Sequence, residues 1–173
     1  MEKLNRKNFK AIMNALAMPG SIKKITSLHD SGFLAIANLL LYSEVSFFYD
    51  GKEDITLVEA INYPKKEEVE CADYIFSDKI DLELLKSAKN GDYANPDFSA
   101  TLIFGCKNFY KTKVILSGPG IDGKKEAMLP CDKEFIKQLK EKNSNYPLGV
   151  EVYFLNDKNQ ILVLSRTTEI EVL

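Results

Sequence analysis

The spacing of apolar residues along the chain predicts several helices. Near the N-terminus, four apolar residues recur three or four positions apart and therefore share one helix face: Phe9, Ile12, Met13 and Leu16. The turn-forming pair Pro19 and Gly20 is expected to end this helix. Further helices are predicted over residues 81–89, over 132–142, and up to Tyr42 from an N-cap at Asp30 or Ser31. Residues 55–61 fit a helix or a strand, and we favour a helix.

Short β-rich runs bounded by turn residues predict the strands. They cover residues 45–49, 73–77, 100–105, 112–117, 150–155 and 160–164, with 169–173 as a candidate edge strand. The runs at 100–105 and 112–117 show little alternation, which predicts strands covered on both faces. Polar residues 156–159 are expected to form a hairpin turn. The pattern predicts one α/β domain over residues 1–173, with a mixed sheet and flanking helices.

Composition is that of an ordinary soluble domain. The 173 residues are 45% hydrophobic and 28% charged, and a chain of this length buries roughly two thirds of its unfolded surface on folding. The net charge of −2 argues against a nucleic-acid binder, which needs clustered positive charge. The lysines of residues 132–142 are interleaved with glutamates, which is typical of a solvated helix face.

Targeting and redox features point to the cytoplasm. The longest apolar run, residues 33–42, is too short to span a bilayer, and the N-terminus lacks the apolar region of a secretory signal. Cys71, Cys106 and Cys131 are widely spaced and form no C-x-x-C pair. We therefore expect reduced thiols, and neither disulfides nor a zinc site.

A glycine-rich segment, "ILSGPGIDGKK" at residues 115–125, resembles two nucleotide-binding motifs. Gly118, Gly120 and Gly123 fit G-x-G-x-x-G, and residues 118–124 fit the start of a P-loop. A P-loop would need a hydroxyl at Lys125, where it would hold magnesium, and a long following helix, which Pro130 would cut short. The dinucleotide motif would need an acidic residue at the end of the next strand. We interpret the segment as a turn whose glycines let the backbone approach a ligand oxyanion or a partner subunit.

No catalytic constellation is apparent. His29 is the only histidine and precedes a predicted helix cap, so a surface or capping role is favoured over catalysis. One histidine and dispersed cysteines make a transition-metal site unexpected, whereas a carboxylate magnesium site stays open. Arg166, Thr167 and Thr168 place three donors just after an apolar strand, which suits contact with an anion or a partner. The alternative is an ion pair from Arg166 to Glu169 or Glu171 at a bend.

Six segments, in order along the chain, resemble the PhnH family, a subunit of the bacterial carbon–phosphorus lyase system for phosphonate breakdown. They are "NFKAIMNALAMPGSI" (8–22), "ADYIF" (72–76), "GDYANPDFSATLIF" (91–104), "LSGPGI" (116–121), "YPLGVEVYF" (146–154) and "SRTTEIEV" (165–172). The resemblance implies a fold like a trimmed PLP-dependent transferase domain that lacks the cofactor.

The same resemblance implies a function in a complex. The family acts beside PhnG-, PhnI- and PhnL-like subunits, which couple a phosphonate to the ribose of ATP with loss of adenine, and the substitution is assigned to the PhnI-like subunit. A PhnJ-like subunit is a further expected partner. We therefore expect a required, non-catalytic subunit of α-D-ribose 1-methylphosphonate 5-triphosphate synthase, which forms a homodimer in isolation. Two alternatives are a stand-alone phosphate- or nucleotide-binding enzyme domain that uses loop 118–124 and Arg166, and a pyridoxal-phosphate protein.

Overall fold

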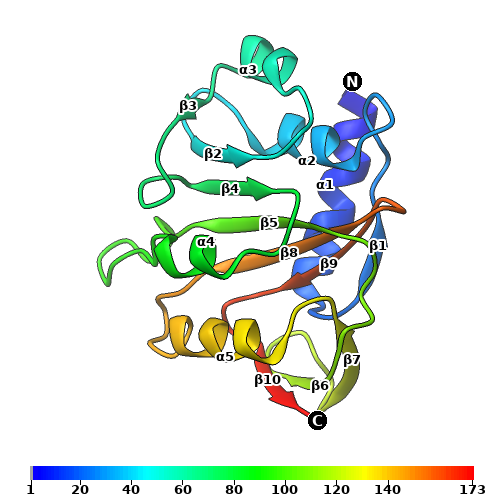
Figure 1. Cartoon of the computed structure of the whole chain (residues 1–173), viewed down its shortest axis with the longest axis vertical. Helices are drawn as coiled ribbons and strands as arrows, with labels where there is room; N and C mark the ends of the chain where they lie inside the picture. The colour runs from blue at the N-terminus through cyan, green and yellow to red at the C-terminus, as the bar shows by residue number, and fades with distance from the viewer. Residues whose placement is uncertain (1) are drawn as a thin grey trace.

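The computed structural model describes residues 2–173. A seven-stranded mixed sheet runs through the middle of the molecule (Figure 1). In spatial order its strands are β1 (Ile22–Lys24), β9 (Gln160–Leu164), β8 (Glu151–Asn156), β5 (Thr101–Cys106), β4 (Tyr74–Ser77), β2 (Ser46–Asp50) and β3 (Lys65–Lys66). Strands β8, β5, β4, β2 and β3 are parallel, whereas β9 is antiparallel to both β8 and β1. The predicted mixed sheet and the 156–159 hairpin are confirmed, but β1 and β3 were not predicted.

The central strands have both faces buried. In β5, Leu102 and Phe104 point into one hydrophobic cluster while Ile103 points into the other. The neighbouring strand β8 divides its side chains in the same way, with Phe154 on one face and Tyr153 on the opposite one. Because neither face meets water, alternation with polar residues disappears. The prediction of a doubly covered strand at 100–105 is therefore confirmed.

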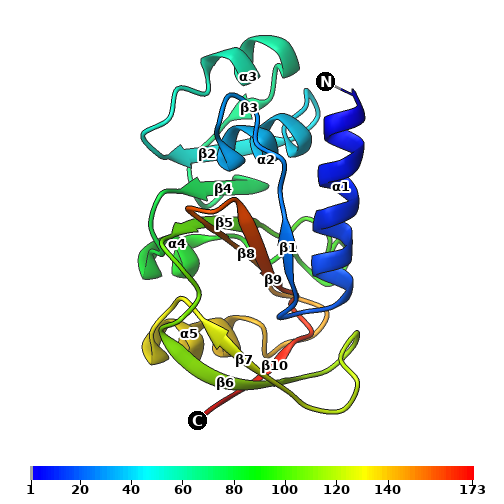
Figure 2. The same cartoon turned by 90° about the vertical axis from the view of Figure 1, so that its right-hand side faces the viewer.

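Helices cover both faces of this sheet (Figure 2). Helices α1 (Glu2–Ala17), α2 (Gly32–Leu40) and α3 (Thr56–Asn62) pack on one face, and α4 (Leu82–Ser87) and α5 (Lys133–Lys142) on the other. All the predicted helices are present, including that at 55–61. The second one ends at Leu40, and its N-cap is Ser31, whose Oγ accepts a hydrogen bond from the Leu34 N–H at 3.0 Å.

A second, three-stranded antiparallel sheet packs below the first on the α5 side (Figure 2). It consists of β10 (Glu169–Val172), β6 (Thr112–Ser117) and β7 (Lys125–Leu129), with β6 in the centre. In β6, Val114 and Leu116 are buried while Lys113 is exposed. The prediction that 112–117 is covered on both faces is wrong. The strand has one solvent-facing side, and the apolar Ile115 on that side hides the alternation.

Asp73, just before β4, links the amino-terminal ends of β2 and β4. Its Oδ2 accepts hydrogen bonds from the Ser46 N–H at 2.7 Å and the Ser46 hydroxyl at 2.8 Å, and its Oδ1 pairs with Lys89 Nζ at 2.6 Å. Burial on its own raises the pKa of Asp73, but the hydrogen bonds from Lys89 and Ser46 outweigh burial and hold the pKa below its ordinary value of 3.8. The charged carboxylate is therefore the form that the fold stabilises.

We predict that Asp73→Asn lowers the free energy of unfolding at neutral pH. Because the pKa of Asp73 is lower in the folded state, its contribution is fully present above about pH 4 and is lost as the pH falls through the folded-state pKa. Urea unfolding of the wild type and the variant at pH 7, 5 and 3 measures this contribution. The difference between the two should shrink in acid, whereas the exposed control Asp122→Asn should show none. A difference that stays constant with pH contradicts the prediction.

Candidate functional site

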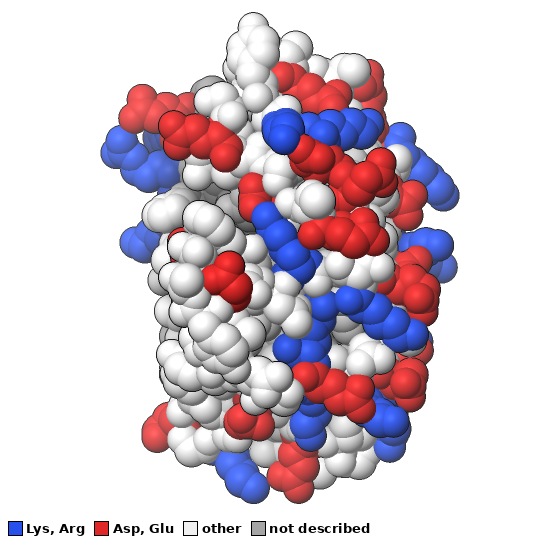
Figure 3. Space-filling view, turned by 90° about the vertical axis from the view of Figure 1, so that its left-hand side faces the viewer, with Lys and Arg blue, Asp and Glu red and all other residues white. Residues whose placement is uncertain are grey.

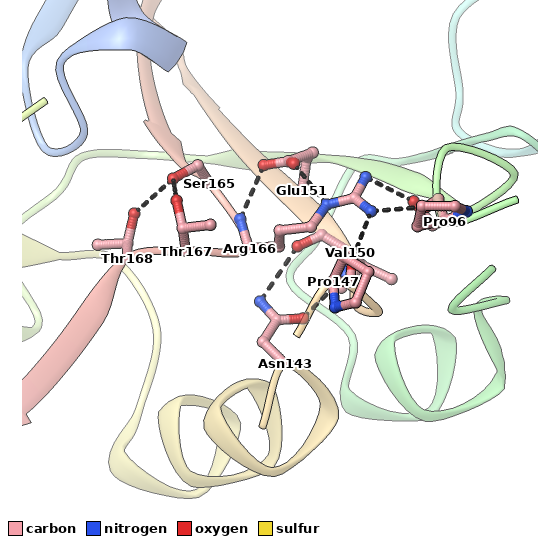
Figure 4. A network of polar contacts seen from close by, with 10 residues as sticks. Pro96, Asn143, Pro147, Val150, Glu151, Ser165, Arg166, Thr167 and Thr168 are labelled. Atoms are coloured by element: carbon pink, nitrogen blue, oxygen red, sulfur yellow. Dashed lines mark hydrogen bonds and ion pairs between the residues drawn. The ribbon is translucent and has the colours of Figure 1, made fainter. Parts of the chain in front are cut away.

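The side chain of Arg166 lies at the junction between the two sheets, in the connection from β9 to β10 (Figure 4). Its side chain is only 18% exposed, and its Nε donates to Glu151 Oε1 at 2.9 Å. The backbone N–H of Arg166 donates to the other carboxylate oxygen of Glu151, also at 2.9 Å. Glu151 begins β8, so this ion pair fixes the end of one sheet to the approach of the other.

The outer nitrogens of Arg166 hold two loops. One Nη donates to the carbonyl oxygens of Pro96 at 2.7 Å and Pro147 at 3.2 Å, and the other donates to Ser99 Oγ at 2.7 Å. Pro96 and Ser99 belong to the loop that leads into β5, and Pro147 to the turn that leads into β8. The rigid fork of the guanidinium suits such a role, since it presents several donors in one plane.

This network uses most of the donors that an external anion would need. A guanidinium has five N–H groups, and those of Arg166 already reach four oxygen acceptors on Glu151, Pro96, Pro147 and Ser99. The alternative, an ion pair from Arg166 to Glu169 or Glu171, is wrong, because the carboxylate of Glu151 takes that place. Glu171 pairs instead with Lys124, at 3.4 Å.

The hydroxyls beside Arg166 also bond to one another. Ser165 Oγ shares hydrogen bonds with Thr167 Oγ1 at 3.1 Å and Thr168 Oγ1 at 2.9 Å (Figure 4). The Thr168 N–H donates to the Ser165 carbonyl oxygen at 3.0 Å and closes a turn. This turn reverses the chain between β9 and β10.

A cavity of about 470 Å³ opens beside this turn, where the three predicted residues Arg166, Thr167 and Thr168 come together. Helix α5 and the loop after it form the opposite wall, with Lys140 and Tyr146 among its lining residues. Asn143 also lines the cavity and exchanges two hydrogen bonds with the Val150 backbone. Lys140 and Glu169 are the charged residues lining this cavity that take no part in the Arg166 network.

The three predicted glycines lie in the connection from β6 to β7, and each has a positive φ. A Cβ added to Gly118 would lie 2.7 Å from the Thr167 carbonyl oxygen, so Gly118 belongs to the site. A Cβ on Gly120 would overlap the carbonyl oxygen of Ala17 at the end of α1, whereas Gly123 meets nothing within 4 Å. The close approach that the glycines permit at Gly118 and Gly120 is therefore to the chain's own backbone.

The strand that follows these glycines excludes both nucleotide-binding motifs. Residues 118–124 join β6 to its antiparallel neighbour β7, so the segment is a hairpin connection. A P-loop and a dinucleotide fold both need a helix whose N-terminus faces the phosphates. Because a strand takes the place of that helix, the segment is not a phosphate cradle of either kind.

A larger cavity, of about 750 Å³, lies at the carboxyl ends of β2, β4, β5 and β8, where ligands of open α/β sheets commonly bind. Three lysines line it: Lys52, Lys79 and Lys107. Four carboxylates line it as well: Asp30, Glu53, Asp78 and Asp157. The opposite charges nearly cancel, so the cavity favours neither an anion nor a cation. The cysteine beside it, Cys106, stays protonated at neutral pH because burial raises its pKa to about 12.

The other groups considered from the sequence lie apart from the Arg166 network. His29 is exposed in the turn before α2, with a positive φ of 47°. Cys131 is buried, which raises its pKa to about 12. Within residues 2–173, no group of three His, Cys, Asp or Glu side chains is placed to hold a metal ion. No helix in the described part of the chain has the length and hydrophobicity needed to cross a membrane.

Comparison with known families decides where the chain belongs. A family model described as "Bacterial phosphonate metabolism protein (PhnH)" matches residues 2–171. The chain belongs to the PhnH family. No curated protein sequence matches it. Membership implies involvement in phosphonate metabolism as part of the carbon–phosphorus lyase system. The likeness to a PLP-dependent transferase fold stays a prediction.

Glu151 and Asn143 of this PhnH-family chain were missed as site residues. Glu151 carries a signal in the sequence, because it is an isolated acid in the apolar run 150–155 and a half-buried carboxylate needs a partner. Its partner lies 15 residues away, which no local pattern reveals. The predicted role of Arg166, Thr167 and Thr168 as anion or partner contacts stays a prediction, and the geometry gives the three residues a structural role as well.

We predict that Arg166→Ala destabilises this PhnH-family chain by about 3 kcal/mol, since it leaves a half-buried Glu151 carboxylate unpaired. Arg166→Lys should restore little of this loss, because an ammonium cannot reach the four acceptors in one plane. Chemical denaturation measures both values. The control Arg6→Ala removes an exposed ion pair with Glu2 and should cost at most about 0.5 kcal/mol. Equal effects at the two arginines would contradict this assignment.

We also predict a contrast between two glycines of the β6–β7 connection. Gly123→Ala should cost about 1 kcal/mol, the strain of a positive φ in open space. Gly120→Ala should cost about 3 kcal/mol, because its Cβ would also overlap the Ala17 carbonyl oxygen and push α1 away. Thermal unfolding of the two variants compares these costs. If Gly123→Ala proves the more damaging, the packing of this connection on α1 is wrong.

Proposed function

We propose that this chain is a required, non-catalytic subunit of the complex that couples a phosphonate to the ribose of ATP and releases adenine, α-D-ribose 1-methylphosphonate 5-triphosphate synthase. The single observation that carries the proposal is the match of residues 2–171 to the PhnH family. Phosphonate metabolism is common to that family. The assignment to this particular reaction is our inference.

The arrangement of polar groups supports a non-catalytic role. A catalytic group must face the reacting atoms with its donor, acceptor or nucleophile available. In the candidate site, the Arg166 guanidinium is paired with Glu151, and the hydroxyls of Ser165, Thr167 and Thr168 bond to one another. The thiols of half-buried Cys106 and buried Cys131 are protonated at neutral pH, because burial raises the pKa of each to about 12. The polar side chains of the site thus hold the protein together.

The proposed partners are PhnG-, PhnI-, PhnJ- and PhnL-like subunits in the cytoplasm. A chain that contributes to a reaction through its surfaces needs apolar side chains outside its core. Several large side chains are exposed on different parts of this chain, among them Phe9 and Met13 on α1 and Leu57 and Ile61 on α3. In the absence of partners, we expect such surfaces to pair two copies of the chain as a homodimer.

The alternative is a domain that binds phosphate or a nucleotide by itself. The observation in its favour is the 470 Å³ cavity, which Lys140, Thr167 and Thr168 all line. Arg166 lines this cavity too, but its donors are engaged elsewhere. Loop 118–124 contributes no cradle, because it is a hairpin connection. An anion would therefore rely on one lysine and two hydroxyls, beside the carboxylate of Glu169.

We predict that the chain co-purifies with co-expressed PhnG-, PhnI- and PhnJ-like subunits from the same bacterium as a stable assembly in gel filtration. Mixing purified components should yield ribosyl triphosphate product only when this chain and its partners are all present. The chain alone should give no product and show no saturable heat of ATP binding. Turnover by the isolated chain, or ATP binding that is lost in Lys140→Ala, would instead favour the stand-alone alternative.

A further inference from the structure

Two loops held by Arg166 present three aromatic side chains to solvent. They are Tyr93, Phe98 and Tyr146, which are 72%, 60% and 73% exposed. The first two belong to loop 91–99, and the third to the loop after α5, residues 143–148. Both loops project from the same side of the molecule, at the left of Figure 1. We call Tyr93, Asp97, Phe98 and Tyr146 the aromatic surface.

The loops are held in one conformation by bonds beneath this surface. Arg166 donates to the carbonyl oxygens of Pro96 and Pro147, one in each loop. Asp92 Oδ1 accepts the N–H groups of Ala94 and Asn95, each at 2.8 Å, and forms a tight turn. Since the backbone is already ordered, a partner that covers these rings loses little conformational entropy on binding.

The charge of the aromatic surface selects its occupant. Residues 91–99 and 143–148 contain two aspartates, Asp92 and Asp97, and no lysine or arginine. The positive charge of Arg166 below them is paired with Glu151. Asp97 is exposed and takes part in no ion pair within residues 2–173. Figure 3 views the molecule from the side of these loops and shows a broad area with few charged residues.

The excess of negative charge in these two loops disfavours a nucleotide and favours a basic polypeptide. Aromatic rings could stack on the adenine of ATP, but neither loop offers a cation to the phosphates, and Lys140 in the cavity beside Tyr146 is accompanied there by Glu169. An arginine matches both features, because its guanidinium pairs with a carboxylate and stacks on a tyrosine ring. Exposed tyrosines of this kind are also frequent at the energetic centres of protein interfaces.

We infer that the aromatic surface docks an arginine-bearing apolar segment of another subunit of the proposed complex. The arginine pairs with Asp97 and stacks on Tyr93 or Tyr146, and apolar residues beside it cover Phe98. Arg166 acts as a positioning residue that holds both loops under this contact. The inference rests on the proposed function, because it takes its partner from that complex.

The test measures the affinity of purified chain for a co-expressed assembly of PhnG-, PhnI- and PhnJ-like subunits that lacks it. The double variant Tyr93→Ser, Phe98→Ser should weaken binding at least about 30-fold, the effect of losing interface hot spots. The matched control Tyr63→Ser, Tyr110→Ser removes two aromatics that are each 74% exposed and lie outside the two loops, and it should change affinity less than about 3-fold. Circular dichroism should show both double variants folded, because all four side chains are exposed.

The charge of Asp97 provides a second readout. Asp97→Asn should weaken binding and flatten its dependence on salt, and Asp97→Lys should weaken it further, because a lysine would repel the incoming arginine. The control substitutions Asp122→Asn and Asp122→Lys, at an exposed aspartate in the β6–β7 connection, should have neither effect. A merely structural role for the loop would not change the salt dependence.

Three outcomes would overturn the inference, and they can be told apart. If the wild type binds the assembly and the Tyr93, Phe98 variant binds equally well, the aromatic surface is not the docking site although the proposed function stands. If the wild type does not bind the assembly, both proposals fail. If the variant instead dissociates a homodimer and leaves binding to the assembly unchanged, the occupant is a second copy of this chain.

Discussion

The ion pair between Arg166 and Glu151 joins the two sheets of this fold and two of its loops. It lies where the seven-stranded sheet gives way to the three-stranded sheet, and its exposure is low on both sides, 18% and 16% of the two side chains. A charge at such a depth is costly unless it is paired and hydrogen-bonded. Glu151 and three further oxygen acceptors provide that pairing, and in doing so they bring the β9–β10 turn, the loop before β5 and the turn before β8 to one point.

This convergence explains why the segments that resemble the PhnH family lie far apart in sequence. Segments 91–104, 146–154 and 165–172 meet at Arg166. Segments 8–22 and 116–121 meet at a second junction, where Gly120 lies against Ala17 and Gly20 against Leu116. What reads as six separate motifs along the chain therefore corresponds largely to two packing junctions.

The elements that depend on local signals were predictable from the sequence. The period of apolar residues predicts the helices, and the cap predicted at Ser31 accepts a backbone N–H of its helix, as Asp81 and Asp132 do at two others. The second sheet was only partly predictable, because β7, "KEAML", has the composition of a helix and becomes a strand by pairing with β6. Arg166, Thr167 and Thr168 were singled out in the sequence by their donors, whereas the pairing of Arg166 with Glu151 depends on tertiary structure.

The same junction supports the proposed non-catalytic role. The guanidinium that the sequence offers as an anion ligand is used to hold two loops, and those loops carry exposed aromatic rings to one side of the molecule. The hydrogen bonds of Arg166 thus hold the loops that carry the aromatic surface. Such an arrangement suits a subunit that contributes to phosphonate metabolism by contact with other polypeptides.

A double-mutant cycle between Arg166 and Glu151 tests this account most directly. The free energy of unfolding is measured for the wild type, Arg166→Met, Glu151→Gln and the double variant. The account predicts a coupling energy of about 2 kcal/mol or more, at the upper end of what contacting residues show. Additive effects within about 0.5 kcal/mol would mean that the pair does not hold the junction together, and would return Arg166 to the role of an available anion ligand.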